Sequence, residues 1–315
     1  MKILNLTDKS GSNIKYKISK FPDGQQNIKI LGIPAIFGGG LEVGFSFDIN
    51  KVQIKARLNN WLDLELIMAT VASLRNLHVQ YIELFVPYFL GARSDRKFEE
   101  SGNHYLKNVL CPVINSLKLN KVTVLDPHSH VLEALITNFA KIDNTNLVRF
   151  AFGMINIGKT IKNSIYEKTI LVSPDAGASH KIYKLAETIG YKGDIITCSK
   201  ERDTEGNLTK TVVTVSSLYS DSLKDHIIID DICDGGRTFI NIAKVIKEKY
   251  ASMNDEDMKG KIYLIVTHGI FSAGFKELNK YFDGIYCTNS YSTIGDYAGN
   301  DMEKTNVKQL NIFNG

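Results

Sequence analysis

Two adjacent aspartates, Asp230 and Asp231, follow a short apolar run in the stretch "HIIIDDICDGGRTF" at residues 226–239. Ionised carboxylates side by side repel each other, and hydroxyl donors or a cation can offset that repulsion. Gly235 and Gly236 come next, and they let the backbone of a strand-to-helix turn approach an anion closely. A sugar phosphate fits both features, with its hydroxyls on the acids and its phosphate in the loop. The alternative is a tight turn with solvated aspartates, and the Gly-Gly-Arg-Thr sequence favours the binding site.

Short apolar strands alternate along the chain with segments of helical periodicity, which is typical of parallel sheets joined by crossover helices. The pattern predicts strands at 81–86, 121–126, 168–173, 194–199, 226–230 and 261–266. It predicts helices at 59–77, 106–117, around 182–189 and around 242–246, with a kink at Pro112 in the second. One face of the first helix would carry Trp61, Leu64, Ile67, Met68, Val71 and Leu74.

Two stretches in the two halves of the chain form a weak internal repeat. "LFVPYFLGARSDRK" at 84–97 and "ILVSPDAGASHK" at 170–181 both run from a strand through a proline and a Gly-Ala step to polar residues. Each is followed later by a strand that ends in aspartate, "VTVLDPHSH" and "IIIDDICDGG". A duplicated α/β domain explains the repeat. Ligands bind such sheets at the carboxyl ends of the strands, so one site at the junction of two domains could collect all four polar stretches.

The length of 315 residues exceeds what one ordinary hydrophobic core holds, so two domains are expected. We place an N-terminal domain at 1–140, a C-terminal domain at 141–290, and a tail at 291–315 that could pack back on the first domain. The least regular stretch, 136–160, is the expected crossing between the domains.

Composition argues against several classes of protein. The net charge of +4 is mild and the basic residues form no dense block, so nucleic-acid binding has little support, although small polyanions remain candidates. The four cysteines show no CxxC spacing, which argues against a disulfide framework and a structural zinc site. No apolar run reaches membrane-spanning length and the N-terminus turns polar early, so we expect a cytoplasmic protein without a membrane partner.

Eight motifs stand in a defined order along the chain: "KFPDGQQNIKI", "VPYFLGARSDRK", "VLDPHSH", "LVSPDAGASHK", "SKERD", "IIIDDICDGGRT", "THGIFSAG" and "TNS". In order and type they resemble the motifs of the ribose-phosphate pyrophosphokinases, and more distantly those of type I phosphoribosyltransferases, from about Phe21 to Asn289. The ARSDRK and DPH motifs point to the kinase. The resemblance implies an α/β fold of two tandem type I phosphoribosyltransferase-like domains, each a mainly parallel sheet flanked by helices.

The resemblance also implies a role for each matching residue. Phe21, Asp23 and Gln25 would hold the adenine of ATP, usually for the active site of a neighbouring subunit, and Arg93, Asp95 and Arg96 would bind ATP and its phosphates. His128 and Asp175 would help to place Mg²⁺, and Lys200 and Arg202 would lie on a mobile loop over the reacting phosphates. Asp230 and Asp231 would take the ribose hydroxyls, and Asp234, Gly235, Gly236, Arg237 and Thr238 would hold the 5-phosphate. Without the resemblance, a solvated surface loop is the better interpretation of Lys200 and Arg202, and a packed histidine at a strand end is an equally good interpretation of His128.

The implied reaction is a diphosphoryl transfer, in which the anomeric hydroxyl of the sugar attacks the β-phosphorus of ATP and AMP leaves. Alignment of the two oxygens and stabilisation of spread negative charge carry most of such catalysis. Arginines, a lysine and Mg²⁺ bridging the phosphates are suited to it. The family further implies a homo-oligomer, a dimer or a hexamer, acting on small-molecule substrates.

Three departures from the family pattern leave questions open. Gln25 stands where the family has a glutamate, and Gly235–Thr238 reads GGRT where the family has TAGT. Arg237 could replace the missing hydroxyl as a ligand of the phosphate of ribose 5-phosphate. Alternatively, it could bind ADP-ribose, whose 5-phosphate carries a further group. A branch of the family adds a diphosphate to ADP-ribose during NAD rebuilding. The segment after "TNS" also differs, so hexamer formation and regulation stay open. The alternatives are a phosphoribosyltransferase and a non-catalytic regulatory relative.

Overall fold

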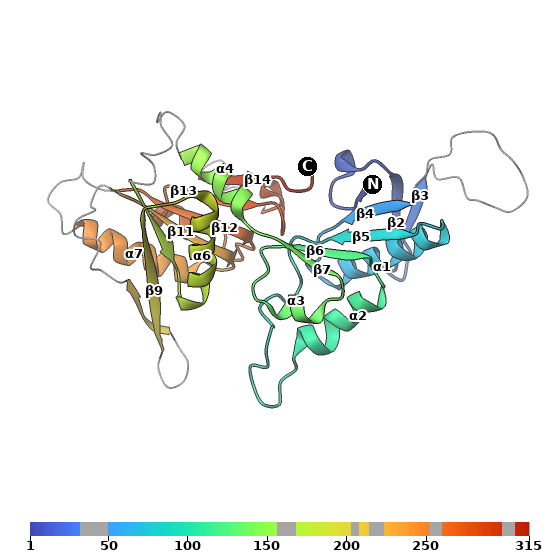
Figure 1. Ribbon diagram of the computed structural model, residues 1–315, viewed down its shortest axis with the longest axis horizontal. Coiled ribbons are helices and arrows are strands. Elements are labelled where there is room, and N and C mark those ends of the chain that lie inside the picture. The colour runs from blue at the N-terminus through green and yellow to red at the C-terminus, as the bar shows by residue number, and fades with distance from the viewer. Residues whose placement is uncertain are drawn as a thin grey trace, which may run out of the picture. The chain divides into compact units, whose positions relative to one another are not determined.

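The computed structural model describes residues 1–31, 50–155, 168–202, 208–213, 224–251, 260–297 and 306–314 (Figure 1). The chain divides into two compact units. The first unit comprises Met1–Ile142 with Asn311–Gly315, and the second comprises Asp143–Leu310. The division lies two residues from the predicted boundary at residue 140. The second unit continues beyond residue 290, however, because β14 (Val307–Leu310) pairs with β13 (Gly284–Thr288) in its sheet.

The sheet of the first unit has the strand order β1-β4-β5-β6-β7, and all of its pairings are parallel. Its strands are β1 (Lys2–Asn5), β4 (Lys51–Lys55), β5 (Tyr81–Phe85), β6 (Lys121–Leu125) and β7 (Phe139–Ile142). Along the chain, each strand of this sheet lies next to the strand before it, always on the same side. Right-handed crossovers in one constant direction place every helix on one face of the sheet. The helices on that face are α1 (Trp61–Asn76), the π-helical turn η2 (Leu106–Leu110) with α2 (Cys111–Ser116), and α3 (Val131–Leu135), as Figure 1 shows.

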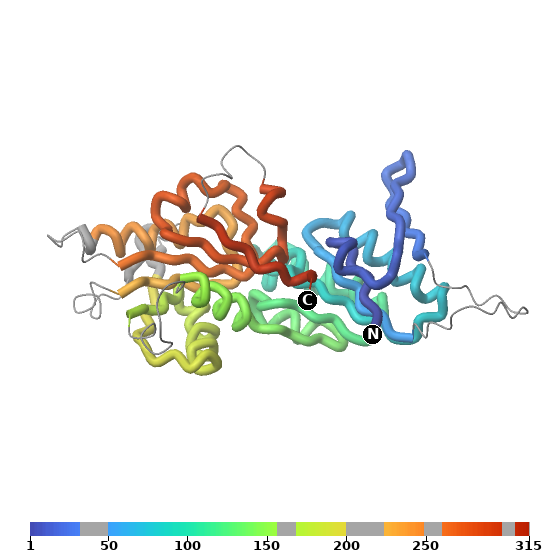
Figure 2. The backbone as a smooth tube through the Cα atoms, turned by 90° about the horizontal axis from the view of Figure 1, so that it is seen from above, coloured from blue at the N-terminus to red at the C-terminus, as the bar shows by residue number. Residues whose placement is uncertain are grey.

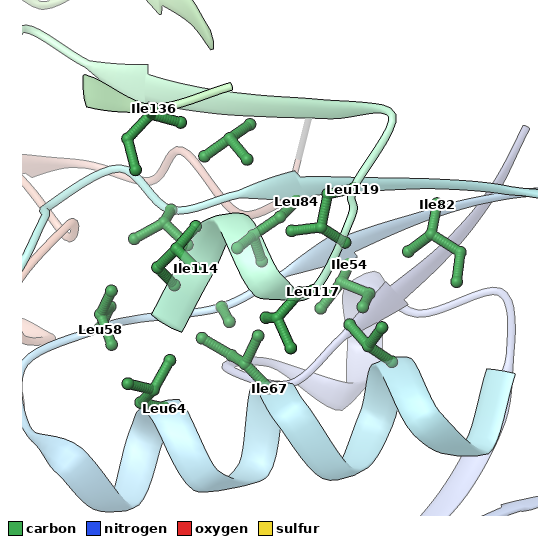
Figure 3. Packing of buried hydrophobic residues seen from close by; sticks show 14 of the residues in the cluster. Ile54, Leu58, Leu64, Ile67, Ile82, Leu84, Ile114, Leu117, Leu119 and Ile136 are labelled. Carbon is green, nitrogen blue, oxygen red and sulfur yellow. The ribbon is translucent and has the colours of Figure 1, made fainter. Parts of the chain in front are cut away.

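Helix α1 supplies much of the core of this unit. A capping box starts it, because the Asn60 side chain accepts from the amide of Asp63 while the Asp63 carboxylate accepts from the amide of Asn60. Its buried stripe, which includes Leu64 and Ile67, packs against strand residues such as Ile54 (Figure 3). The predicted stripe was wrong at its flanks: Trp61, the first helical residue, is 48% exposed and Met68 is 40% exposed. Pro112 lies in the first turn of α2, directly after η2, and the predicted kink there stays a prediction.

A hairpin missed by the sequence analysis precedes this sheet. Strands β2 (Lys15–Lys20) and β3 (Gln26–Leu31) pair antiparallel, and the hairpin stands out from its unit in Figure 2. The side-chain amide of Gln26 donates to the Leu62 carbonyl at 2.5 Å, and its backbone amide donates to Glu65 at 3.2 Å. The hairpin is therefore anchored to α1 at the start of β3.

The last residues of the chain belong to the first unit. The Phe313 ring is 1% exposed and lies 6.1 Å from the ring of Phe85. The Phe313 carbonyl accepts from Lys55 Nζ at 3.1 Å and from Asn5 Nδ2 at 3.2 Å. These three partners alternate along their strands with the core residues Leu4, Ile54 and Leu84, so they face away from the helices. The tail thus covers part of the sheet face that the helices leave open.

The sheet of the second unit has the order β10-β9-β8-β11-β12-β13-β14, with only β10 antiparallel among these strands. Its further strands are β8 (Thr169–Ser173), β9 (Asp194–Arg202), β10 (Leu208–Val213), β11 (Asp225–Cys233) and β12 (Ile262–Gly269). The chain moves outward from β8 to β9 and then returns to place β11 on the other side of β8. Helices consequently cover both faces, α4 (Thr145–Ile155) and α6 (Ala176–Ile189) on one, α7 (Arg237–Ala251) and α8 (Lys276–Tyr281) on the other.

The predicted α/β class, with mainly parallel sheets flanked by helices, is confirmed. The stretch 136–160 is not irregular where it is described, since it forms β7 and α4. The division between the two units, after Ile142, falls between these two elements.

Candidate active site

The reversal of strand order between β8 and β11 is the point at which α/β sheets usually bind ligands, just beyond the carboxyl ends of the strands. Asp175 follows β8 and caps α6, where its Oδ1 accepts from the Ala178 amide at 3.0 Å. Asp230 and Asp231 lie near the end of β11, which pairs with β8. The structure therefore brings three of the predicted acids to one edge of the sheet.

The two adjacent aspartates have different surroundings. Asp231 is buried, and its Oδ2 lies 2.6 Å from the Nζ of Lys181. Burial, followed by the charges of Asp231 and Asp175, raises the pKa of Asp230 to about 8, although the amide of Asp231 donates to its Oδ1 at 2.9 Å. A carboxyl group that keeps its proton can donate a hydrogen bond, whereas its charged neighbour can only accept. The pair is thus suited to adjacent hydroxyl groups, which both donate and accept.

Lys181 is a site residue that the sequence analysis missed. It belongs to α6, and its partner Asp231 lies 50 residues further along the chain. Its side chain is 37% exposed at the edge of the sheet, so its charge also reaches solvent. The sequence held one signal for Lys181, which is the last residue of the motif "ILVSPDAGASHK" and lies in the helical segment that begins after Asp175.

The loop between β11 and α7 has the geometry of an anion-binding turn. Gly236 has a φ of +78°, and a Cβ at this position would lie 2.8 Å from Leu278 Cδ2, so the position requires glycine for two reasons. Helix α7 begins at Arg237, and the amides of a first helical turn lack helical partners. The side chain of Arg237 is exposed beside them. The residues predicted to hold a phosphate, Asp234 to Thr238, therefore form one turn at a helix N-terminus.

The turn after β12 supports this loop from outside. The amides of Ile270 and Phe271 donate to the Cys233 carbonyl at 2.8 and 3.1 Å, and Ser272 Oγ donates to Asp234 Oδ1 at 2.5 Å. Phe271 has a φ of +48°, and its ring packs 4.9 Å from that of Phe275. Ile270, Phe271 and Ser272 belong to the motif "THGIFSAG", whose sequence alone indicated no role in the loop.

Lys200 and Arg202 were predicted to lie in a loop, and this was wrong for their backbone. Their backbone forms the end of β9, where Lys200 pairs with Thr211 and Arg202 with Leu208 of β10. Strand β9 neighbours β8 and runs parallel to it, so the backbone of both residues lies at the carboxyl edge of the sheet, as Asp175 does. The turn at 203–207 lies outside the described residues.

The predicted ATP-binding residues Arg93, Asp95 and Arg96 lie in the irregular segment after β5, and His128 lies in the turn after β6. These parallel strands are neighbours, and the two segments begin with shared backbone bonds: the Val86 amide donates to the Thr123 carbonyl at 3.0 Å, and the Leu125 amide donates to the Pro87 carbonyl at 3.1 Å. The first unit thus brings these four residues to the carboxyl edge of its own sheet. Arg93, Arg96 and His128 are exposed there.

Phe21, Asp23 and Gln25 lie together at the tip of the β2–β3 hairpin. The Phe21 amide donates to the Gln25 carbonyl at 2.8 Å, and the Gln25 amide donates to Asp23 Oδ1 at 3.1 Å. The Phe21 ring is 49% exposed. A half-exposed ring on a projecting hairpin can stack on a base that is held mainly by other residues, and the role of the tip in adenine binding stays a prediction.

The donor groups at these edges suit Mg²⁺ bound with phosphates better than a closed metal site. Across the described ranges, no three His, Cys, Asp or Glu side chains are grouped to hold a metal ion. Mg²⁺ commonly takes one or two carboxylates and fills its other positions with water and substrate phosphates, and Asp175 can supply one such carboxylate.

Two further expectations concern cysteines and membranes. Cys111, Cys198, Cys233 and Cys287 are all buried and free, which confirms that they form no disulfide framework. Within the part of the chain that the structure describes, no helix has both the length and the apolar character needed to cross a membrane.

The known proteins that this chain resembles belong to the family that the motifs indicated. No family model matches the chain. It is 28% identical to a protein of Mycoplasmopsis pulmonis over 234 residues, 74% of this chain and 65% of that protein, and 25% identical to one of Thermosipho africanus over 280 residues, 88% of this chain and 78% of that protein. The relatives are ribose-phosphate pyrophosphokinases. The chain spans less than two thirds of the length of the first.

The structure resembles that of phosphoribosylpyrophosphate synthetase from Mycobacterium smegmatis, with a TM-score of 0.69 and 16% identity over 95% of this chain and 87% of that one. This likeness confirms the predicted fold of two phosphoribosyltransferase-like domains. The resemblance to ribose-phosphate pyrophosphokinases that the motifs indicated is likewise confirmed over most of the chain. The interpretation of the chain as an enzyme of the diphosphotransferase type agrees with the names of these relatives.

Proposed function

We propose that the protein is a Mg²⁺-dependent diphosphokinase that transfers the β,γ-diphosphate of ATP to the anomeric 1-hydroxyl of a 5-phosphoribosyl acceptor. The observation that carries the proposal is the adjacency of two features at the end of β11. The Asp230–Asp231 pair can bind ribose hydroxyls, and the glycine turn that follows can bind the 5-phosphate. Residues three to eight positions apart would then hold both ends of one ribose phosphate.

The acceptor hydroxyl attacks the β-phosphorus of ATP. The new bond joins O1 of the sugar to that phosphorus and O1 gives up its proton to solvent, while the bond from the phosphorus to the oxygen bridging to the α-phosphate breaks and AMP leaves. Lys200 and Arg202 stabilise the negative charge that spreads over the transferred group, while Arg93, Asp95 and Arg96 hold ATP. Asp175 and His128 would help to hold Mg²⁺, which would supply neutralisation of the phosphate charge.

The adenine of ATP would contact Phe21, Asp23 and Gln25 at the tip of the hairpin, with the tip supplied by a neighbouring copy of the chain. The exposure of Phe21 supports this assignment, because an apolar ring at a projecting tip gains from being covered. The protein would then act as a homo-oligomer, a dimer or a hexamer.

Two acceptors fit the altered phosphate loop: ribose 5-phosphate, which would give 5-phosphoribosyl 1-diphosphate, and ADP-ribose, which would give its 1-diphosphate for NAD rebuilding. The names of the relatives favour the first, and Arg237 favours the second. Its guanidinium is exposed at the start of α7, and the described residues offer it no ion-pair partner, so it can take a further phosphate bidentately.

The test is incubation with ATP and Mg²⁺ and with each acceptor separately, followed by identification of products by mass. We expect AMP and a 1-diphosphate product with at least one acceptor, loss of both products in EDTA, and their return with added Mg²⁺. If neither acceptor reacts and the protein instead joins a base to 5-phosphoribosyl 1-diphosphate, it is a phosphoribosyltransferase. If it binds these ligands without turnover, it is a non-catalytic relative.

A further inference from the structure

Lys181 joins two elements of the candidate site. It belongs to α6, which begins after Asp175 at the end of β8, and its Nζ lies 2.6 Å from Oδ2 of Asp231 in the neighbouring strand β11. The side chain of Asp231 is 6% exposed, whereas that of Lys181 is 37% exposed. The ion pair therefore extends from the solvent edge of the sheet to a carboxylate that is almost fully buried.

A buried carboxylate depends on the charge that accompanies it. The charge of the partner offsets the cost of removing the carboxylate from water, and loss of the partner leaves an uncompensated charge. Such a group takes up a proton or turns towards other donors, and in either case it no longer presents the same acceptor to a ligand. For Asp231 the accompanying charge comes from another element, 50 residues earlier in the chain. The place of this carboxylate is thus tied to the position of α6.

We propose that Lys181 is a positioning residue that holds the Asp231 carboxylate in place to accept a hydrogen bond from a ribose hydroxyl of the acceptor. The inference rests on the proposed function, which assigns the acid pair to the ribose. Lys181 acts on the ligand through Asp231, so its loss raises the dissociation constant and the KM of the acceptor. It changes kcat by less, because the hydroxyl contact is made in the bound substrate as well as in the transition state.

The test is titration calorimetry of the full-length protein with ribose 5-phosphate and with ADP-ribose, together with KM and kcat for the acceptor that reacts. Lys181→Met removes the charge and keeps a long side chain, and it should weaken binding of the acceptor that the wild type binds by roughly 10–100-fold, the usual effect of losing a hydrogen bond to a charged group. Lys181→Arg restores a positive charge and should recover most of the affinity. If thermal unfolding shows that Lys181→Met is not folded, Lys181→Gln replaces it with the same expectation.

Lys224→Met is the matched control. Lys224 Nζ lies 2.9 Å from Asp194 Oδ2, and this pair joins the starts of β11 and β9 at the opposite, amino edge of the same sheet. The control removes one lysine charge and one ion pair from the same unit, and it should leave acceptor affinity unchanged.

The Lys181→Met substitution in an Asp231→Asn background separates positioning from direct contact with the ligand. With no carboxylate to hold, it should cause no further loss of affinity. An equal loss in both backgrounds would overturn the inference, since Lys181 would then attract the phosphate of the acceptor directly. If the wild type binds an acceptor and Lys181→Met binds it equally well, the inference alone fails. If the wild type binds neither acceptor, the proposed function fails and the inference fails with it.

Discussion

Neutralising Asp230 should stabilise the folded protein at neutral pH, although it removes a group that we expect to bind substrate. Burial and the charges of Asp231 and Asp175 raise the pKa of Asp230 from the ordinary 3.8 to about 8. Between these two values the folded protein keeps a proton that the unfolded chain has lost. The contribution of Asp230 to the free energy of unfolding is therefore largest below pH 3.8 and falls as the pH rises towards 8, by up to about 1.4 kcal/mol per pH unit. Asp230→Asn abolishes this loss.

The size of the effect follows from the pH interval and from the surroundings of the carboxyl group. Between pH 5 and pH 7, a carboxyl group that stays protonated in the folded state and is ionised in the unfolded chain lowers the free energy of unfolding by roughly 2.7 kcal/mol. Asp230 is only partly buried, and Lys181 and the amide of Asp231 offset some of the repulsion, so we expect about half of that. At about 2–4 °C per kcal/mol for a domain of this size, the melting temperature of Asp230→Asn should gain roughly 3–6 °C on the wild type over this interval.

The assay is thermal unfolding of both full-length proteins at pH 5, 6 and 7 in EDTA and phosphate-free buffer, so that neither metal nor anion occupies the site. Taking the difference at each pH cancels the titration of groups that the two proteins share. Asp231→Asn is the matched control. It removes the partner that lies 2.6 Å from Lys181 and should lower the melting temperature at every pH. A difference between Asp230→Asn and wild type that stays constant from pH 5 to pH 7 would refute the reasoning.

Three further substitutions test other parts of the molecule. Lys200→Ala should lower single-turnover rates by roughly 10²–10³-fold with an unchanged melting temperature, because the lost charge acts mainly in the transition state, and near-normal turnover would contradict its role. Arg237→Ala should lower kcat/KM for ADP-ribose roughly 10–100-fold more than for ribose 5-phosphate, and a wild type that neither uses nor is inhibited by ADP-ribose would disprove the larger acceptor. Phe313→Ala should cost about 3–5 kcal/mol in denaturant unfolding, because the ring is 1% exposed, and an unchanged transition would show that the tail is not docked in solution.

Much of the candidate site was predictable because its parts are local. The acid pair, the two glycines and the helix start of α7 follow one another without interruption, and each has its own requirement for residue type. The position of Asp175 at the carboxyl edge of the sheet was predictable for the same reason, because it closely follows a strand. The ion pair between Lys181 and Asp231 and the bond from Ser272 to Asp234 were not predictable. Their partners are 50 and 38 residues apart, and no periodicity in either segment specifies the other.

In the fold, too, some elements were predictable from the sequence and others were not. Apolar periodicity placed α1 and the strands β5, β6, β8 and β11, because burial on one or two faces is written into the spacing of the residues themselves. It failed for the β2–β3 hairpin, where exposed lysines such as Lys15 and Lys17 alternate with the inward-facing Tyr16 and Ile18 and resemble a solvated loop in composition. It also failed for Trp61, which has the correct helical spacing but is the first residue of α1 and stays exposed.

Two series of parallel strands and crossover helices, and the polar residues that end those strands, can be read from the amino-acid sequence. The direction of each crossover cannot be read from it and is set by the packing of the folded chain. In the first unit each described strand of the main sheet is added on the same side, so the described helices cover one face and the tail residue Phe313 packs on the other. In the second unit the chain reverses at β8, which places β11 beside it and brings Asp175, Lys181 and Asp231 together. The physical reason is that side-chain periodicity encodes which face of an element is buried, whereas strand order depends on the packing of the whole sheet.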